Sequence, residues 1–336
     1  MEAMRMNASL PLEAGQTAPC DDSRESLRQT FLAGEGLDQE WLIPLPSDAS
    51  KRKYFRLSEA LLMDAPPPHE KTISFQLIAD LLHECGLSVP QIYAADHANG
   101  FLLIEDLGEL PYRKAIEEGI PEVLLYGETI SALIHLHQKL PDNPMGLPSY
   151  DLELFLKNAC LYLEWYDPSL PEEAQAQFKE VWEEAYQNQP QIPTGLLLKD
   201  VMVDNLLWIP EREGFKRCGF IDFQDGVWGP ISYDLVSLLE DSRRDLSPSF
   251  AQEMLDIYFK VFPDLSPDEF WASYCLWGAQ RSVRILGVFA RLAKRDGKSH
   301  YMEHCPRIWK YLQRDLAHPH LQDLKKWFEC YGKFND

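Results

Sequence analysis

The sequence predicts an α+β protein with two lobes, a small antiparallel β lobe followed by a larger helical lobe. Three observations support this fold class. Short β-type runs separated by turn residues extend to about residue 106, amphipathic helical patterns dominate after it, and one pair of short apolar runs interrupts the helical part. A length of 336 residues is enough for two lobes and a sizeable core.

The β lobe is expected over residues 24–106, after a flexible tail at 1–23. Its strands are predicted at EWLIPL, KYFRL, ALLMDA, PQIYAAD and GFLLIED, which begin at residues 40, 53, 60, 90 and 100. Tight turns are expected at Ser58-Glu59 and Asn99-Gly100. Between the third and fourth strands, residues 70–86 carry apolar residues at helical spacing and end at a glycine. These elements predict a small antiparallel sheet with one helix.

The helical lobe is expected over residues 107–336. Long amphipathic segments lie at 121–141, 152–166 and 171–187, and helical patterns resume after Tyr233. Between them, the apolar runs LLWIP and CGFI flank the turn at Glu213-Gly214. This arrangement predicts a short β-hairpin inside the helical lobe.

Composition and charge narrow the classes of function. Hydrophobic residues make up 45% and charged residues 25% of the chain, as in ordinary globular proteins, and no apolar run reaches the length of a membrane helix. A net charge of −21 disfavours nucleic-acid binding, which needs basic contacts to phosphates. The seven cysteines are scattered singly, which is typical of reduced thiols and not of structural zinc. We therefore expect a cytoplasmic protein that binds neither nucleic acid nor membrane.

Polar side chains at the ends of the predicted hairpin suggest a reaction. Asp200 precedes the first apolar run, Asn205 begins it, and Asp222 follows the second. Mg²⁺ prefers such carboxylate and amide oxygens, and phosphoryl transfer needs mainly positioning and charge neutralisation. Asp200 is then suited to orient an acceptor hydroxyl and take its proton. The alternative is that Asp200, Asp204 and Asp225 are turn residues that only cap the ends of strands.

The segment KDVMVDNLL, followed by FIDFQDGVWGPISYDLVSLL, resembles the catalytic segment of the aminoglycoside phosphotransferase-like kinases, small-molecule relatives of protein kinases. The branch it resembles most is that of the anomeric N-acetylmuramate/N-acetylglucosamine kinases of cell-wall recycling. Further matching pieces, such as PLPSDASKRKYFRL and GAQRSVRILGVFARLAKRDGK, extend the resemblance from about residue 41 to 327. The resemblance implies a protein-kinase-like fold that binds ATP and Mg²⁺ between its lobes.

The resemblance also implies roles for individual residues. Asp200 matches the catalytic aspartate, Asn205 and Asp222 match the metal-binding pair, and Asp234 matches a structural aspartate that braces the loop. The other implied contacts are to the nucleotide: the phosphate loop at 46–52 with Ser47 and Ser50, positive charge from Arg52, Lys53 or Arg56, and the backbone of Glu105 and Leu107 beside adenine.

Three departures from the family pattern accompany these matches. Leu198 and Met202 stand where the family loop carries histidines, and Ser47 stands where a glycine is expected. The strand ALLMDA lacks the lysine that pairs with ATP. None of these changes removes an oxygen ligand of the metal.

The acceptor side of the predicted site contains two arginines. Arg281 and Arg284 share one helix face, where they can clamp an anionic group such as the lactyl carboxylate of N-acetylmuramate, or form an exposed basic face. Asp225 is a candidate for a hydrogen bond to a sugar hydroxyl. The resemblance therefore predicts a small-molecule phosphotransferase acting on an amino sugar. Two alternatives remain, an aminoglycoside or choline-type kinase and a nucleotide-binding pseudokinase.

Overall fold

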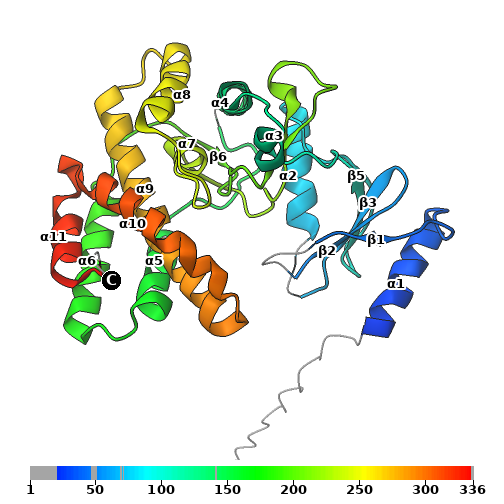
Figure 1. Ribbon diagram of the computed structural model, residues 1–336, viewed down its shortest axis with the longest axis horizontal. Helices are drawn as coiled ribbons and strands as arrows, with labels where there is room; N and C mark the ends of the chain where they lie inside the picture. Colours follow the sequence, from blue (N-terminus) through cyan, green and yellow to red (C-terminus); the bar gives the residue numbers. More distant parts are fainter. Residues whose placement is uncertain (1–20, 47–50, 69, 71, 141, 334–336) are drawn as a thin grey trace, which may run out of the picture.

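The computed structural model describes residues 21–46, 51–68, 70, 72–140 and 142–333. Figure 1 shows two lobes, a small one built on a sheet in blue and cyan, and a larger helical one that runs from green to red. The predicted two-lobed α+β fold class is therefore confirmed. The first 20 residues of the expected tail, and the phosphate-loop residues Ser47 and Ser50, lie outside the described residues.

The small lobe contains a five-stranded antiparallel sheet in the order β1-β2-β3-β5-β4. Its strands are β1 (Ile43–Pro44), β2 (Lys53–Arg56), β3 (Ala60–Asp64), β4 (Ile92–Asp96) and β5 (Phe101–Glu105). All of them lie at the predicted segments. Gly100, in the turn between β4 and β5, has a φ of 73°, and a Cβ there would lie 2.1 Å from the carbonyl oxygen of Ala65. Only glycine fits this turn.

Helices cover both faces of the sheet. The predicted helix α2 (Thr72–Glu84) packs against the face that carries Met63 and Ile104. The opposite face, with Leu62 and Phe101, is covered by α1 (Asp21–Gly34), a helix that the sequence analysis did not anticipate. It begins within the segment expected to be a flexible tail. Arg24 of α1 reaches buried Asp64 at 2.6 Å and lies 4.0 Å from the ring centre of Phe101.

The large lobe is mainly helical, as expected. Its helices are α3 (Tyr112–Glu117), α4 (Glu122–Lys139), α5 (Leu152–Leu161), α6 (Glu172–Gln187), α7 (Ser232–Leu239), α8 (Pro248–Val261), α9 (Pro267–Asp296), α10 (Cys305–Leu316) and α11 (Gln322–Tyr331). The predicted helix at 152–166 ends in a π-helical turn, Tyr162–Tyr166. The buried Trp277 anchors α9 in an aromatic core, with its ring centre 5.1 Å from that of Phe155. Among the described residues, none of the helices combines the length and apolar character needed to cross a membrane.

Two short antiparallel ribbons lie within the large lobe. The predicted hairpin is present as β7 (Leu206–Trp208) and β8 (Cys218–Phe220). A second ribbon, formed by β6 (Thr194–Leu197) and β9 (Val227–Pro230), was not expected. The segment that joins β6 to β7 contains Asp200, and the segment that joins β8 to β9 contains Asp222. The two ribbons thus fix both ends of each functional segment.

Candidate active site

A cavity of about 620 Å³ lies between the lobes. The predicted site residues that line it are Arg52, Arg56, Glu105, Leu107, Asp200, Asn205, Asp222, Arg281 and Arg284. Asp225 is exposed and is absent from this lining, and Asp234 is completely buried beneath it. Residues from both lobes thus meet around one cavity.

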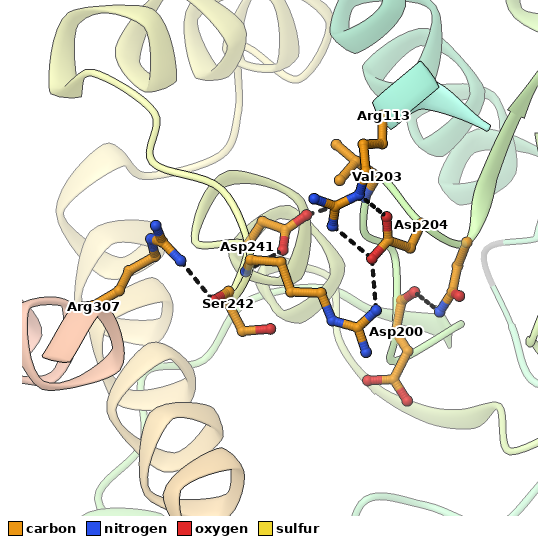
Figure 2. Close-up of polar contacts among 9 residues, drawn as sticks. Arg113, Asp200, Val203, Asp204, Asp241, Ser242 and Arg307 are labelled. Carbon is orange, nitrogen blue, oxygen red and sulfur yellow. Dashed lines mark hydrogen bonds and ion pairs between the residues drawn. The ribbon is translucent and has the colours of Figure 1, made fainter. Parts of the chain in front are cut away.

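Two buried carboxylates hold the loop that carries Asp200. Asp234 accepts hydrogen bonds from the backbone N–H groups of Leu198, at 2.6 Å, and Lys199, at 2.8 Å. Asp241 accepts one from Val203 at 3.1 Å, as Figure 2 shows. Burial raises the pKa of Asp234 to about 7, because it outweighs the opposing effect of the two N–H donors. The loop is therefore fixed at two points, by the first turn of α7 and by the segment after this helix.

Asp200 faces the cavity, with 32% of its side chain exposed. Its Oδ1 lies 3.0 Å from the guanidinium of Arg284 on α9. Burial alone would raise the pKa of Asp200, but Arg284, Arg281 and Lys199 outweigh it and hold the pKa below its usual value. At neutral pH this carboxylate is charged and can accept a proton from a hydroxyl group.

Asn205 and Asp222 lie at the same end of the β7–β8 hairpin. The side-chain amide nitrogen of Asn205 donates to the backbone carbonyl of Asp200 at 2.9 Å, and the backbone carbonyl of Asn205 accepts from the N–H of Ile221 at 3.1 Å. The first bond fixes the amide so that its Oδ1 points the other way. An amide oxygen and a carboxylate are a fitting protein contribution to Mg²⁺, which takes its remaining oxygens from phosphates and water. Within the described ranges, His, Cys, Asp and Glu form no group of three that could hold a metal ion.

The side chains of β2 alternate in direction across the sheet. Arg52, Tyr54 and Arg56 line the cavity, whereas Phe55 packs against the α1 side of the sheet. Arg56 is bound to Asp106 at 2.6 Å and also pairs with Glu109, so it braces the connection between the lobes. The alternation leaves Arg52 as the cation of this strand that lies beside Asp222.

The connection between the lobes presents backbone groups to the cavity. Glu105 directs its N–H to Gln91, at 2.8 Å, and its side chain to Arg212, at 2.6 Å. Leu107 lines the cavity, and no hydrogen bond within the described residues uses its backbone N–H or C=O. Leu107 therefore has the better placed backbone groups for a flat heterocycle.

Arginines surround the end of the cavity near α9. Arg281 is 3% exposed and donates to the carbonyl of Glu240 at 3.2 Å, while Arg284 holds Asp200. The two arginines therefore face the catalytic loop, and the alternative of an exposed basic face is wrong. An apolar wall completes this end, formed by Ile285, Val288, Phe289, Leu292 and Tyr301.

An arginine bridge that the sequence did not predict crosses the loop that carries Asp200. Asp204 accepts from Arg113 at 2.6 and 2.8 Å and from Arg243 at 2.6 Å. Figure 2 shows Asp204 beside Arg113 and close to the segment with Asp241. Asp204 thus joins the loop to α3 and to the segment after α7, which is more than capping a strand. The double arginine in EDSRRD, residues 240–245, was the available signal.

Leu198 and Met202, which stand where the family loop carries histidines, have different surroundings. Leu198 is 3% exposed and belongs to the large apolar core, where its backbone is held by Asp234. Met202 lines the cavity. The first replacement therefore keeps the loop anchored by apolar packing, and the second changes a surface that a substrate can touch.

Comparisons with known proteins confirm the resemblance. The phosphotransferase enzyme family matches residues 41–271. The chain is 34% identical to an N-acetylmuramate/N-acetylglucosamine kinase of Caulobacter vibrioides, over 92% of this chain and 96% of that protein. It is 33% identical to a kinase of the same name from Pseudomonas aeruginosa, over 84% of this chain and 86% of that protein.

Solved structures share the fold at low sequence identity. A choline/ethanolamine kinase family protein of Mesorhizobium loti gives a TM-score of 0.63 at 14% identity. The match covers 92% of this chain and 100% of that protein. An ADP-bound aminoglycoside phosphotransferase gives 0.56 at 15% identity, covering 85% and 96%. The family match over most of the chain, the curated relatives and the fold agree, and the chain belongs to the phosphotransferase enzyme family.

Proposed function

We propose that this protein is a cytoplasmic, ATP-dependent kinase that phosphorylates the anomeric hydroxyl of N-acetylmuramate or N-acetylglucosamine. The observation that carries the proposal is 34% identity, over 92% of the chain, to a kinase with these two sugars in its name. It is supported by the meeting of Asp200, Asn205 and Asp222 around one cavity, because phosphoryl transfer needs oxygen ligands for a metal and a group that positions the acceptor.

Asp200 is the proposed catalytic residue. Its ionised carboxylate accepts the proton of the acceptor hydroxyl as the hydroxyl oxygen bonds to the γ-phosphorus of ATP. The bond from that phosphorus to the bridging oxygen breaks, and ADP leaves with the electron pair. Arg284 fixes the orientation of the carboxylate at 3.0 Å and keeps it charged.

Asn205 and Asp222 are the proposed metal ligands. Bound Mg²⁺ supplies positive charge that offsets the charge of the phosphates. Leu107, and to a lesser degree Glu105, would contact adenine through backbone groups, and Ser47 and Ser50 would lie over the phosphates. In this proposal the lobes at residues 24–106 and 107–336 provide the two walls of the nucleotide site.

The acceptor would bind at the arginine-rich end of the cavity. Arg243, Arg281 and Arg284 line that end, so its positive charge favours a neutral or anionic sugar over a cationic amine. This supports an amino sugar over an aminoglycoside or choline. Asp225 stays a predicted sugar contact, although its exposed side chain lies outside the cavity lining.

The proposal is tested by ADP release from ATP and Mg²⁺ with a panel of N-acetylmuramate, N-acetylglucosamine, aminoglycosides and choline. We expect turnover with the two sugars and a fall of about 10²- to 10⁴-fold in kcat for Asp200→Asn. Turnover with the amines alone would show that the acceptor is an amine and not one of the two sugars. Binding of ATP without turnover of any acceptor would favour the pseudokinase.

A further inference from the structure

The strand that usually supplies a cation to the phosphates has none in this chain. In protein kinases a lysine on the third strand pairs with a glutamate of the neighbouring helix. Here the residues of β3 that point towards the cavity side are Leu61 and Met63. Asp64 points to the opposite face, where it pairs with Arg24. The charge must come from elsewhere.

Arg52 lies where such a cation is needed. Its guanidinium is 2.6 Å from Asp222 and 3.5 Å from Glu70, and 10% of its side chain is exposed. Burial lowers its pKa, but Tyr54, Asp222 and Glu70 outweigh that effect, so the group keeps its charge. Arg52 lines the cavity.

Glu70 lies two residues before helix α2, and this helix also packs against the residue that follows Asp222. Phe75 of α2 packs on Phe223, which follows Asp222, with ring centres 4.8 Å apart. The Glu70 carboxylate, the Arg52 guanidinium and Asp222 are thereby held within one packed unit.

We propose that Arg52, oriented by Glu70, replaces the strand lysine and binds the phosphates of the nucleotide. This rests on the proposed function, in which Asp222 holds Mg²⁺. The Arg52 charge, now opposite Asp222, would then be shared with phosphate oxygens, while Glu70 keeps the guanidinium in place. Arg56 is unsuited to this role because it is bound to Asp106 and Glu109.

The test is nucleotide binding without an acceptor, measured by calorimetry with ATP, ADP and adenosine in the presence of Mg²⁺. We expect Arg52→Ala to weaken ATP and ADP binding by about 10- to 100-fold, the size of a charged hydrogen bond, and to leave adenosine binding within about twofold. Arg52→Lys should restore part of the loss. Arg295→Ala removes an exposed guanidinium at the end of α9, outside the cavity lining, so it is the matched control and should bind all three ligands as the wild type does. Lys53→Ala is made to test the other cation beside Arg52 that the sequence offered for this role.

Glu70 is tested as a positioning residue. Glu70→Gln should weaken ATP binding by several-fold in the wild type, and have no further effect when added to Arg52→Ala, because it acts through that arginine. Thermal melting of each variant shows whether it is folded.

Unchanged ATP and ADP affinity in folded Arg52→Ala would overturn the inference and leave the proposed kinase intact. The inference is also overturned if Lys53→Ala weakens ATP and ADP binding more than Arg52→Ala does. Equal wild-type affinity for adenosine and ATP would also overturn it. If the wild type and Arg52→Ala differ as expected but no acceptor is turned over, the proposed function fails and the phosphate contact stands.

Discussion

The two walls of the cavity are held in place by different interactions. In the large lobe, buried Asp234 and Asp241 bind backbone N–H groups of the catalytic loop. In the small lobe, the cavity-facing cations of β2 are held by ion pairs whose acids are partly exposed, such as Asp106 and Asp222. Buried hydrogen bonds are screened little by salt, whereas exposed ion pairs are weak and are screened by it. We call the wall that carries Asp200 the preorganised wall, because buried hydrogen bonds hold it, and the wall formed by Arg52 and β2 the adjustable wall, because ion pairs hold it.

The strongest way to break the preorganised wall is Asp234→Asn. An amide in place of the carboxylate has one oxygen for two N–H groups and turns its own N–H₂ towards one of them. We expect a loss of about 1–3 kcal/mol in the free energy of unfolding, measured by urea denaturation, and a lower kcat. Unchanged stability would show that the loop does not depend on this carboxylate.

Asp234 also predicts a pH dependence of stability. Its pKa is raised from 3.8 to about 7, so the folded state binds this proton more tightly than the unfolded state. Its contribution to stability is therefore present below about pH 4 and decreases as the pH rises towards 7. The difference in unfolding free energy between the wild type and Asp234→Asn should change over this range. A constant difference would contradict the raised pKa.

Arg284→Gln tests what keeps Asp200 charged. Without this guanidinium the pKa of Asp200 should rise, so the acid limb of the kcat/KM profile should move to higher pH, with kcat lower at every pH. Arg295→Gln is the control, because Arg295 is an exposed residue of the same helix that pairs with Asp296. An unchanged acid limb would mean that Asp200 does not depend on Arg284.

Arg56→Gln addresses the adjustable wall. It removes the ion pairs with Asp106 and Glu109 and should raise the KM for ATP by up to about fivefold, which corresponds to about 1 kcal/mol. We expect kcat to stay unchanged and the wild-type KM for ATP to rise with salt. A variant that loses kcat instead would show that both walls are coupled to the chemical step.

Lys199→Gly should have the smallest effect and the opposite sign. Lys199 has a φ of 73°, a conformation that costs residues other than glycine about 1 kcal/mol. Glycine should raise the free energy of unfolding by roughly 0.5–1 kcal/mol, seen as a melting temperature a few degrees higher. A lower melting temperature would show that the lysine side chain stabilises the loop.

The sequence by itself determined most of the fold and grouped the residues of the proposed catalytic set. Period-two and helical patterns located the sheet of the small lobe, α2 and the long helices of the large lobe. The spacing of Asp200, Asn205 and Asp222 around a hairpin was enough to group them, because adjacent antiparallel strands bring their ends together. These are local signals, which depend on neighbours in the chain.

Only the tertiary structure decided the features that depend on distant partners. Helix α1 packs through Leu27, Phe31 and Leu32, but its other anchors, Arg24 and Arg28, are charged. These two arginines become buried only against Asp64 and the rings of the sheet. The pairing of β6 with β9, the bridge through Asp204 and the inward direction of Arg284 likewise join segments far apart in sequence. A charged side chain looks the same in the sequence whether it meets water or a buried carboxylate, and the fold alone supplies that partner.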